Sequence, residues 1–264
     1  MQQANNKRST RTLILAMLVL VVLSTITAKV YYSRINQGVD PRILPARMGY
    51  KTYNEKAQIS DFTGILNILD SIAFYYQQVP HYQNSYELGV VHINRAATFM
   101  TVGLHIDSLR VSHSLGFMKN LTKKGLLDLA EEELNKGIQI YSDWNYKYQD
   151  LDIQELTSDL RKNFYLDFDE YPAERQEQCF KARLKELETA QWENDRRLSV
   201  AFTNLGIIYF QRDNYTQAAE YFNMALELWG DNLNAENNLN SMLGRPLVKR
   251  NFIQKMFPKE REGG

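Results

Sequence analysis

Apolar side chains recur every three or four residues through most of this chain, which is the spacing that lines one face of an α-helix. Residues 62–78 show it clearly, because Asp61 precedes the apolar stripe as a helix cap and Pro80 follows it as a stop. The same spacing predicts helices over 84–105, 109–121, 126–144, 151–166, 173–197 and 234–243, with a turn at Lys124-Gly125. The 173–197 helix is highly charged, and we expect it to be exposed and to continue into the stretch after it.

Strand signals are almost absent from the sequence. The chain of 264 residues holds only 13 Gly and 6 Pro, so long helices with short turns are favoured over a many-stranded sheet. Its 44% hydrophobic and 23% charged residues are typical of a globular protein. We therefore predict an all-α fold, an antiparallel helical array over residues 61–243.

A continuous apolar segment lies near the N-terminus. No charge falls between Arg11 and Lys29, and as a helix this run is roughly 26 Å long, close to the thickness of a bilayer core. We predict a transmembrane signal anchor at residues 12–31, after a basic tail at 1–11. A cleaved signal peptide ending at Ala28 is the alternative, but Ile26, two residues before that point, is too large for the usual cleavage pattern.

Basic residues flank the predicted span on both sides, so the positive-inside rule is nearly balanced. A short basic tail before a first apolar segment usually stays in the cytoplasm. That predicts an extracytoplasmic, periplasmic location for the C-terminal domain of a single-pass membrane protein, and the reversed topology stays open. We expect residues 32–60 to be a juxtamembrane linker, because Gly and Pro interrupt the periodicity there, and 244–264 to be a loose basic tail.

Charge and composition argue against several functions. Lys+Arg and Asp+Glu are both 31, so the sequence does not indicate a nucleic-acid-binding protein. Cys179 is the only cysteine and cannot form an intramolecular disulfide, and the four histidines do not have metal-ligand spacing. No phosphate-binding or nucleophile motif is present. We predict no catalytic residue, no metal site and no cofactor, and a chain that is not an enzyme.

Residues 199–232 carry a spaced signature. Two helical stretches place large and small side chains at fixed intervals, namely Phe202, Leu205, Gly206, Tyr209, Ala218, Phe222 and Ala225. This stretch resembles the tetratricopeptide repeat (TPR), whose pattern is W-x2-L-G-x2-Y followed by A-x3-F and another Ala. In that family the small residues let two antiparallel helices approach closely while the large ones fill the gaps. The resemblance implies a TPR-like α-solenoid, in which several repeats stack.

A weaker echo of the signature lies at residues 111–144. The spacing from Leu127 to Tyr141 aligns with that from Tyr215 to Trp229, and a degenerate first helix would lie around 114–121. A third candidate second helix covers 96–104. The helix at 234–243 would cap the array, and residues 145–197 look like an insertion of longer helices.

The resemblance implies a function as well. Members of the family bind peptides or helices in a groove lined by the first helix of each repeat, which here gives the candidates Thr203, Asn204, Ile207, Phe210 and Gln211. We therefore predict a membrane-anchored scaffold or adaptor for protein–protein interactions, with protein partners, at the bacterial cell envelope. The alternatives are a component of an envelope enzyme system that binds a small molecule or glycan, and a cytoplasm-facing adaptor.

Overall fold

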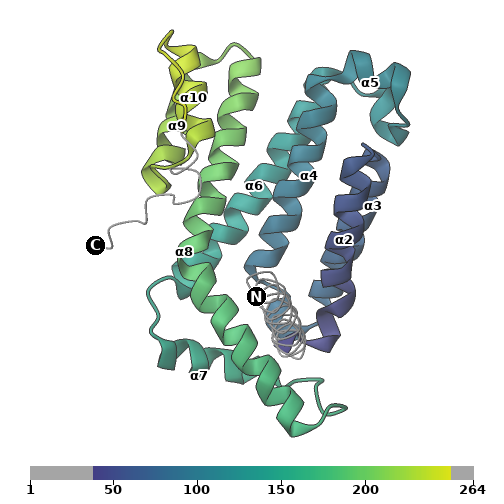
Figure 1. Ribbon diagram of the computed structural model, residues 1–264, viewed down its shortest axis with the longest axis vertical. Coiled ribbons are helices and arrows are strands. Elements are labelled where there is room, and N and C mark those ends of the chain that lie inside the picture. Colours follow the sequence, from purple (N-terminus) through teal and green to yellow (C-terminus); the bar gives the residue numbers. More distant parts are fainter. Residues whose placement is uncertain (1–37, 251–264) are drawn as a thin grey trace, which may run out of the picture.

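The structure, a computed structural model, describes residues 38–250, and within them it is helical without strands, which confirms the all-α prediction (Figure 1). The α-helices are α2 (Leu44–Gln58), α3 (Phe62–Gln77), α4 (Tyr86–Leu104), α5 (Ile106–Ser112), α6 (Lys123–Tyr148), α7 (Ile153–Phe164), α8 (Ala173–Gln211), α9 (Tyr215–Leu228) and α10 (Leu233–Met242). Three short 3₁₀ helices are η1 (Pro41–Ile43), η2 (Pro80–Tyr82) and η3 (Gly116–Asn120).

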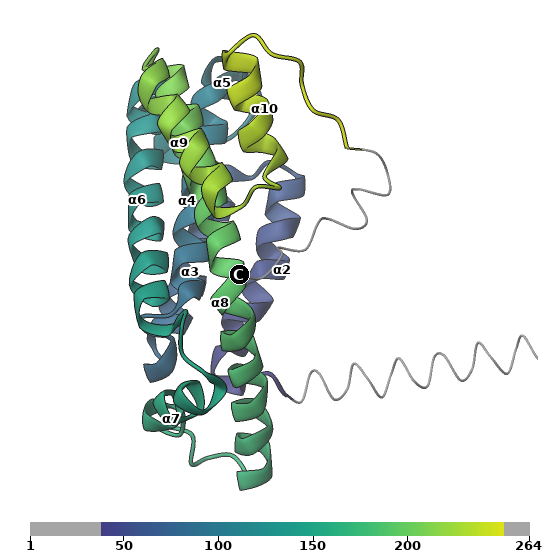
Figure 2. The ribbon, with the colours of Figure 1, turned by 90° about the vertical axis from the view of Figure 1, so that its left-hand side faces the viewer.

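The long helices pair into three antiparallel hairpins that stack side by side. Helix α2 packs on α3, α4 on α6, and α8 on α9, while α3–α4, α6–α8 and α9–α10 contacts join one hairpin to the next (Figure 1). Figure 2 shows α6 and α9 on one side of the array and α2 and α10 on the other. The arrangement is that of a short solenoid, in which each hairpin covers the apolar face of its neighbour.

Glycines allow the helices of the second and third hairpins to approach closely. A Cβ added at Gly89 would lie 2.5 Å from Tyr141 Cε1, and one at Gly137 would lie 2.7 Å from Ile93 Cδ1. In the third hairpin, a Cβ at Gly206 would lie 2.5 Å from Phe222 Cε1. The same packing device thus joins α4 to α6 and α8 to α9.

The pairing of α6 corrects the prediction of a degenerate repeat at 111–144. Its partner is α4, and the segment expected to be its first helix is η3, which begins at Gly116 with a left-handed φ of +52°. The predicted 109–121 helix is accordingly divided between α5 and η3. The expected turn at Lys124-Gly125 lies in the first turn of α6, because the Thr122 side chain accepts a hydrogen bond from Gly125 N at 3.0 Å and begins the helix there.

The predicted linker at 32–60 is also corrected, since most of its described part is helical. Pro45 lies in the first turn of α2, where its missing N–H is tolerated. Gly49 packs closely on Ile72 of α3. In the sequence alone, Pro45 and Gly49 predict an interruption of the helix. The segment before α2 is held as well, because Arg42 donates hydrogen bonds to the carbonyls of Leu166 and Phe164 and lies 3.9 Å over the Phe168 ring.

The charged helix over 173–197 runs into the repeat as a single helix, α8, as expected, but it is not an exposed rod. Its buried side chains, including Cys179, Phe180, Arg183 and Leu187, pack with α7 and the end of α6 in a second, aromatic-rich core. Cys179 donates a hydrogen bond to the Val39 carbonyl at 3.4 Å, and burial raises the pKa of its thiol, which fits a structural role. The insertion therefore packs in a second core, which it shares with α4 and α6.

The predicted span at 12–31 lies outside the described residues and stays a prediction. None of the helices within 38–250 is long and apolar enough to cross a membrane. The tail that follows α10 lies along it as far as residue 250, where Asn237 and Val248 exchange hydrogen bonds of 3.1 and 2.7 Å and Arg250 forms a 3.1 Å ion pair with Asp231. The remainder of that tail, from 251, lies outside the described part of the chain.

Candidate functional site: a groove between α2 and α8

The α8–α9 hairpin uses the signature residues for packing. Leu205, Gly206, Ala218, Phe222 and Ala225 are all buried between the two helices and their neighbours. The aromatic members line its flank, because Phe202 stacks on the Tyr221 ring with the centroids 6.1 Å apart and Tyr209 contacts the same ring at a tilt, with the centroids 5.3 Å apart.

Tyr209 also ties this hairpin to the one before it. Its hydroxyl donates to Glu131 of α6 at 2.7 Å, and that bond, with partial burial, raises the pKa of Tyr209 to about 12. The signature residues therefore hold the helices together and do not form a binding surface.

One predicted groove residue has a structural role in this fold. Thr203 is 4% exposed and accepts a 2.9 Å hydrogen bond from the Asn232 side chain, which also donates to Ser199 at 2.8 Å. The Asn232 oxygen accepts from Ala235 N at 3.1 Å and so caps α10. Thr203 thus helps to hold α10 on α8 and is not accessible to a partner.

We expect Asn232→Ala to lower the free energy of unfolding by about 2 kcal/mol. The change removes a helix cap and leaves two buried hydroxyls, those of Ser199 and Thr203, without their donor. Urea denaturation followed by circular dichroism measures the effect. The exposed Asn234→Ala in the same helix is the matched control, and an equal loss in both variants would refute the capping role of Asn232.

The other four groove candidates lie along α8 without forming one shared cavity wall. Ile207 packs against the first core, and Asn204 is half-buried. Phe210 is 38% exposed and contacts the Tyr215 ring, while Gln211 accepts a 2.8 Å hydrogen bond from Lys123 of α6. Whether they contact a partner stays a prediction.

A groove that these residues do not line runs between α2 and the N-terminal half of α8. It has two compartments of about 540 and 280 Å³ that share Arg47, Ala182, Lys185 and Glu186 as walls. Gly38 and Val39 extend the larger compartment, and Tyr86 and Arg197 close the smaller one. Helix α2, the insertion core and the start of α4 therefore build it together.

The groove is strongly basic. Its walls carry the cations Arg47, Lys181, Lys185 and Arg197 against a single carboxylate, Glu186. That carboxylate is already bonded to Arg47 and, at 3.0 Å, to Arg183. Lys185 is exposed and makes no ion pair within residues 38–250, and Lys181 has only an exposed partner on its own helix, Glu177 at 3.5 Å. Such exposed i,i+4 pairs are weak, so both amines can serve a ligand.

A buried ion pair is linked to the groove wall through Glu186. Arg183 donates to the two carboxylate oxygens of Glu87 at 2.5 and 3.3 Å, and both side chains are nearly inaccessible, at 1% and 8%. Burial disfavours the charged form of each group, but the attraction and hydrogen bonds between the two charges outweigh it. The pKa of Glu87 therefore lies below its ordinary value, and the pKa of Arg183 lies well above its ordinary value. The pair links α4 to α8 and holds Glu186 in the groove wall through Arg183.

Comparison with known proteins bears on one part of this architecture. The family model of the tetratricopeptide repeat matches residues 199–232, the α8–α9 hairpin and the turn that follows it. Searches of curated proteins and of solved structures give no match to this chain. The chain thus holds a TPR-like unit within a helical array, and such units suggest a scaffold for protein–protein interactions.

The sequence pattern does not indicate the groove, because Gly and Pro predict a linker where α2 forms and the dense charge predicts a solvated helix at the start of α8. One signal could have found α2. Ile43, Ala46, Tyr50 and Tyr53 follow helical spacing and now face the first core. Within residues 38–250 no group of three His, Cys, Asp or Glu side chains is placed to hold a metal ion.

Proposed function

We propose that this chain is a membrane-anchored scaffold whose basic groove between α2 and α8 receives an acidic segment of a partner protein. The surplus of cations in the groove, with Lys181 and Lys185 left available, is the observation that carries this proposal. Complementary charge steers association and selects among partners. The TPR-like unit supports a protein ligand rather than a nucleic acid, as does the formal net charge of zero.

The shape of the groove favours an extended or helical segment. Its two compartments lie next to each other and share wall residues, among them Lys185 and the half-buried Ala182, and a lysine can offer an aliphatic stem as well as a charge. A segment lying along α8 would place acidic side chains against Lys181 and Lys185, which are four residues apart and therefore on one face of the helix. Arg47 and Arg197 would then bracket it from α2 and from further along α8.

The membrane anchor at 12–31 is part of the proposal. Only residues 32–37 separate it from the described domain, and a chain of that length reaches about 20 Å when fully extended. The groove, whose larger compartment includes Gly38 and Val39, would then lie near the membrane surface. Anchoring would raise the effective concentration of the domain near a membrane-bound partner.

We propose that the domain is extracytoplasmic. Reporter fusions after residue 264 test this, using one reporter active only in the cytoplasm and one active only outside it. We expect activity from the second alone. Activity from the first alone would establish the cytoplasm-facing topology and leave the groove proposal untouched.

Reversing two groove charges should weaken binding of an acidic peptide. We expect Lys181→Glu with Lys185→Glu to reduce the affinity for a fluorescent peptide of about ten residues rich in Glu at least 10-fold, because two attractive contacts become repulsive. Fluorescence anisotropy measures it, and binding to the unaltered chain should weaken with salt. Lys119→Glu with Lys124→Glu, at exposed positions of η3 and α6, is the matched control. An equal loss of affinity in both double variants would show that only the net charge of the protein matters and would contradict the groove as the binding site.

A further inference from the structure

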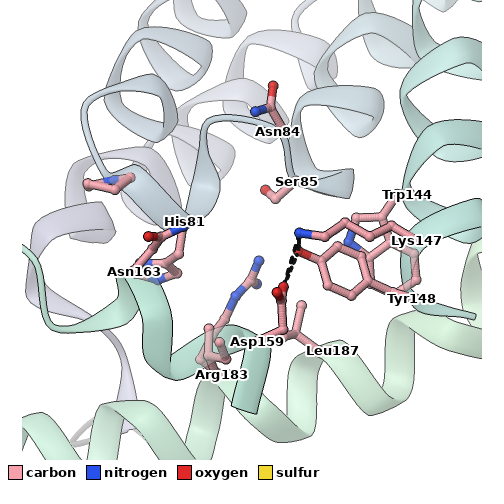
Figure 3. A pocket seen from close by; sticks show the side chains of 12 residues that line it. His81, Asn84, Ser85, Trp144, Lys147, Tyr148, Asp159, Asn163, Arg183 and Leu187 are labelled. Carbon is pink, nitrogen blue, oxygen red and sulfur yellow. Dashed lines mark hydrogen bonds and ion pairs between the residues drawn. The ribbon is translucent and has the colours of Figure 1, made fainter. Parts of the chain in front are cut away.

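A second cavity lies at the edge of the aromatic-rich core, where η2 and the start of α4 meet the ends of α6 and α7 and the N-terminal half of α8 (Figure 3). Its volume is about 100 Å³. Trp144 and Leu187 supply apolar wall, and the polar side chains around the cavity are His81, Asn84, Ser85, Lys147, Tyr148, Asp159, Asn163 and Arg183. Ser85 and Tyr148 already donate hydrogen bonds to Glu87 and Asp159. Asn84 and Asn163 are exposed and stand at its mouth.

Three buried polar atoms of this cavity have no hydrogen-bond partner in the described structure. They are both ring nitrogens of His81, whose side chain is only 4% exposed, and Nε of Arg183. Burial, together with the nearby Arg183 and Arg42, lowers the pKa of His81 to about 2, so its ring is neutral and offers one donor and one acceptor. Buried polar groups are normally satisfied, so these three atoms need an occupant.

The charges of the cavity are already balanced. Lys147 forms a 3.0 Å ion pair with Asp159, and Arg183 is paired with Glu87. The nearest carboxylate to His81, that of Asp40, is 3.7 Å from Nε2 and is itself bound to Arg42. An ion would therefore enter without a counter-charge, while a neutral group that both donates and accepts matches Arg183 Nε and the His81 ring.

We propose that this cavity binds adjacent hydroxyl groups of a small uncharged polyol, either free or as the edge of a saccharide. Its volume equals that of about three water molecules, which is also the size of a three-carbon polyol. Hydroxyls would accept from Arg183 Nε and bond with His81, the amides of Asn84 and Asn163 would complete the set at the mouth, and the C–H face would lie against Trp144. This site is separate from the basic groove, so either proposal can fail alone.

The test is a titration of the full chain in detergent micelles with glycerol, followed by NMR of ¹⁵N-labelled histidine rings and of the Trp indole N–H groups. We expect a saturable shift of the His81 and Trp144 signals. His81→Phe, which keeps a ring but removes both unpartnered nitrogens, should abolish the saturable shift at Trp144 and raise the melting temperature. Asn163→Ala should weaken binding at least 3-fold, and Asn67→Ala, at an exposed position of α3, should leave it unchanged.

Each outcome decides the proposal. Saturation by glycerol but not by a methyl glycoside supports a free polyol, and saturation by both supports a saccharide edge. A linear, non-saturating shift that is the same in His81→Phe would mean that the cavity holds water only and would overturn the proposal. Saturation by acetate or phosphate in place of glycerol would overturn it as well. If His81→Phe does not fold, Asn163→Ala against Asn67→Ala decides alone.

Discussion

Replacing Glu87 with alanine is expected to lower the free energy of unfolding by about 3 kcal/mol, because it leaves the buried guanidinium of Arg183 with only the partly exposed Glu186, at 3.0 Å, as a counter-charge. Arg183 is 2% exposed and its guanidinium carbon lies 4.0 Å from the centre of the Tyr82 ring, so the charge cannot move into bulk solvent when the carboxylate is lost. Urea denaturation of the domain measures the loss. Glu188→Ala is the matched control, because this exposed glutamate lies on α8 shortly after Arg183, and it should change stability by less than about 0.5 kcal/mol.

Removing both charges should cost much less than removing one. Glu87→Met combined with Arg183→Met replaces the pair by apolar side chains of similar volume, and such exchanges are often neutral or stabilising. The Glu87→Ala defect should also shrink in acid. The folded pKa of Glu87 lies below its ordinary value of 4.5, so its contribution is full above that value and is lost as pH falls through the folded pKa. A single-variant loss below about 1 kcal/mol would contradict the role given to this pair.

Substituting Gly206 by alanine should destabilise the TPR-like unit by about 2 kcal/mol. The new Cβ would lie 2.5 and 2.7 Å from two atoms of the Phe222 ring, which is 1% exposed and cannot move into solvent. Overpacking of this kind costs about 1–3 kcal/mol and exceeds the helix propensity that alanine gains. Thermal and urea denaturation measure it.

Two comparisons make the Gly206 result specific. Gly230→Ala is the matched control, because a Cβ there would meet only the Leu226 carbonyl at 3.8 Å and should be nearly neutral. Adding Phe222→Leu to Gly206→Ala should recover part of the loss, since the smaller side chain makes room for the methyl group. No loss in Gly206→Ala, or an equal one in Gly230→Ala, would show that α8 and α9 are not held at this contact.

The features that the sequence predicted correctly depend on local chemistry. Apolar spacing located α3, α4, α6 and α7 to within a few residues, and Asp61 caps α3 through a 2.9 Å bond from Gly64 N as its position implied. The spacing of Gly206 and Ala218 indicated the close α8–α9 hairpin, which the TPR match now supports.

The features that it did not predict depend on tertiary contacts. Gly49 reads as a breaker in sequence, yet in α2 it is the point of contact with Ile72. Arg183 reads as one of many surface charges on α8, yet it is buried because Glu87, 96 residues earlier, neutralises it. The basic groove is not predicted for the same reason, because its walls come from α2 and from the charged half of α8. Periodicity gives the elements, but only packing decides which helix faces pair.

Site-specific photocrosslinking from Thr189, an exposed residue in the wall of the smaller groove compartment, tests the central proposal most directly. The full chain in its native membrane would carry the crosslinker there or, as a control, at the exposed Asn135 on α6. We predict a protein adduct from Thr189 alone, and we expect the crosslinked segment of the partner to be rich in Asp and Glu. The adduct should be lost when Lys181→Glu is combined with Lys185→Glu. It should return when acidic residues of the partner segment are changed to Lys. Equal adducts from both positions, or an adduct that the charge reversal leaves unchanged, would contradict it.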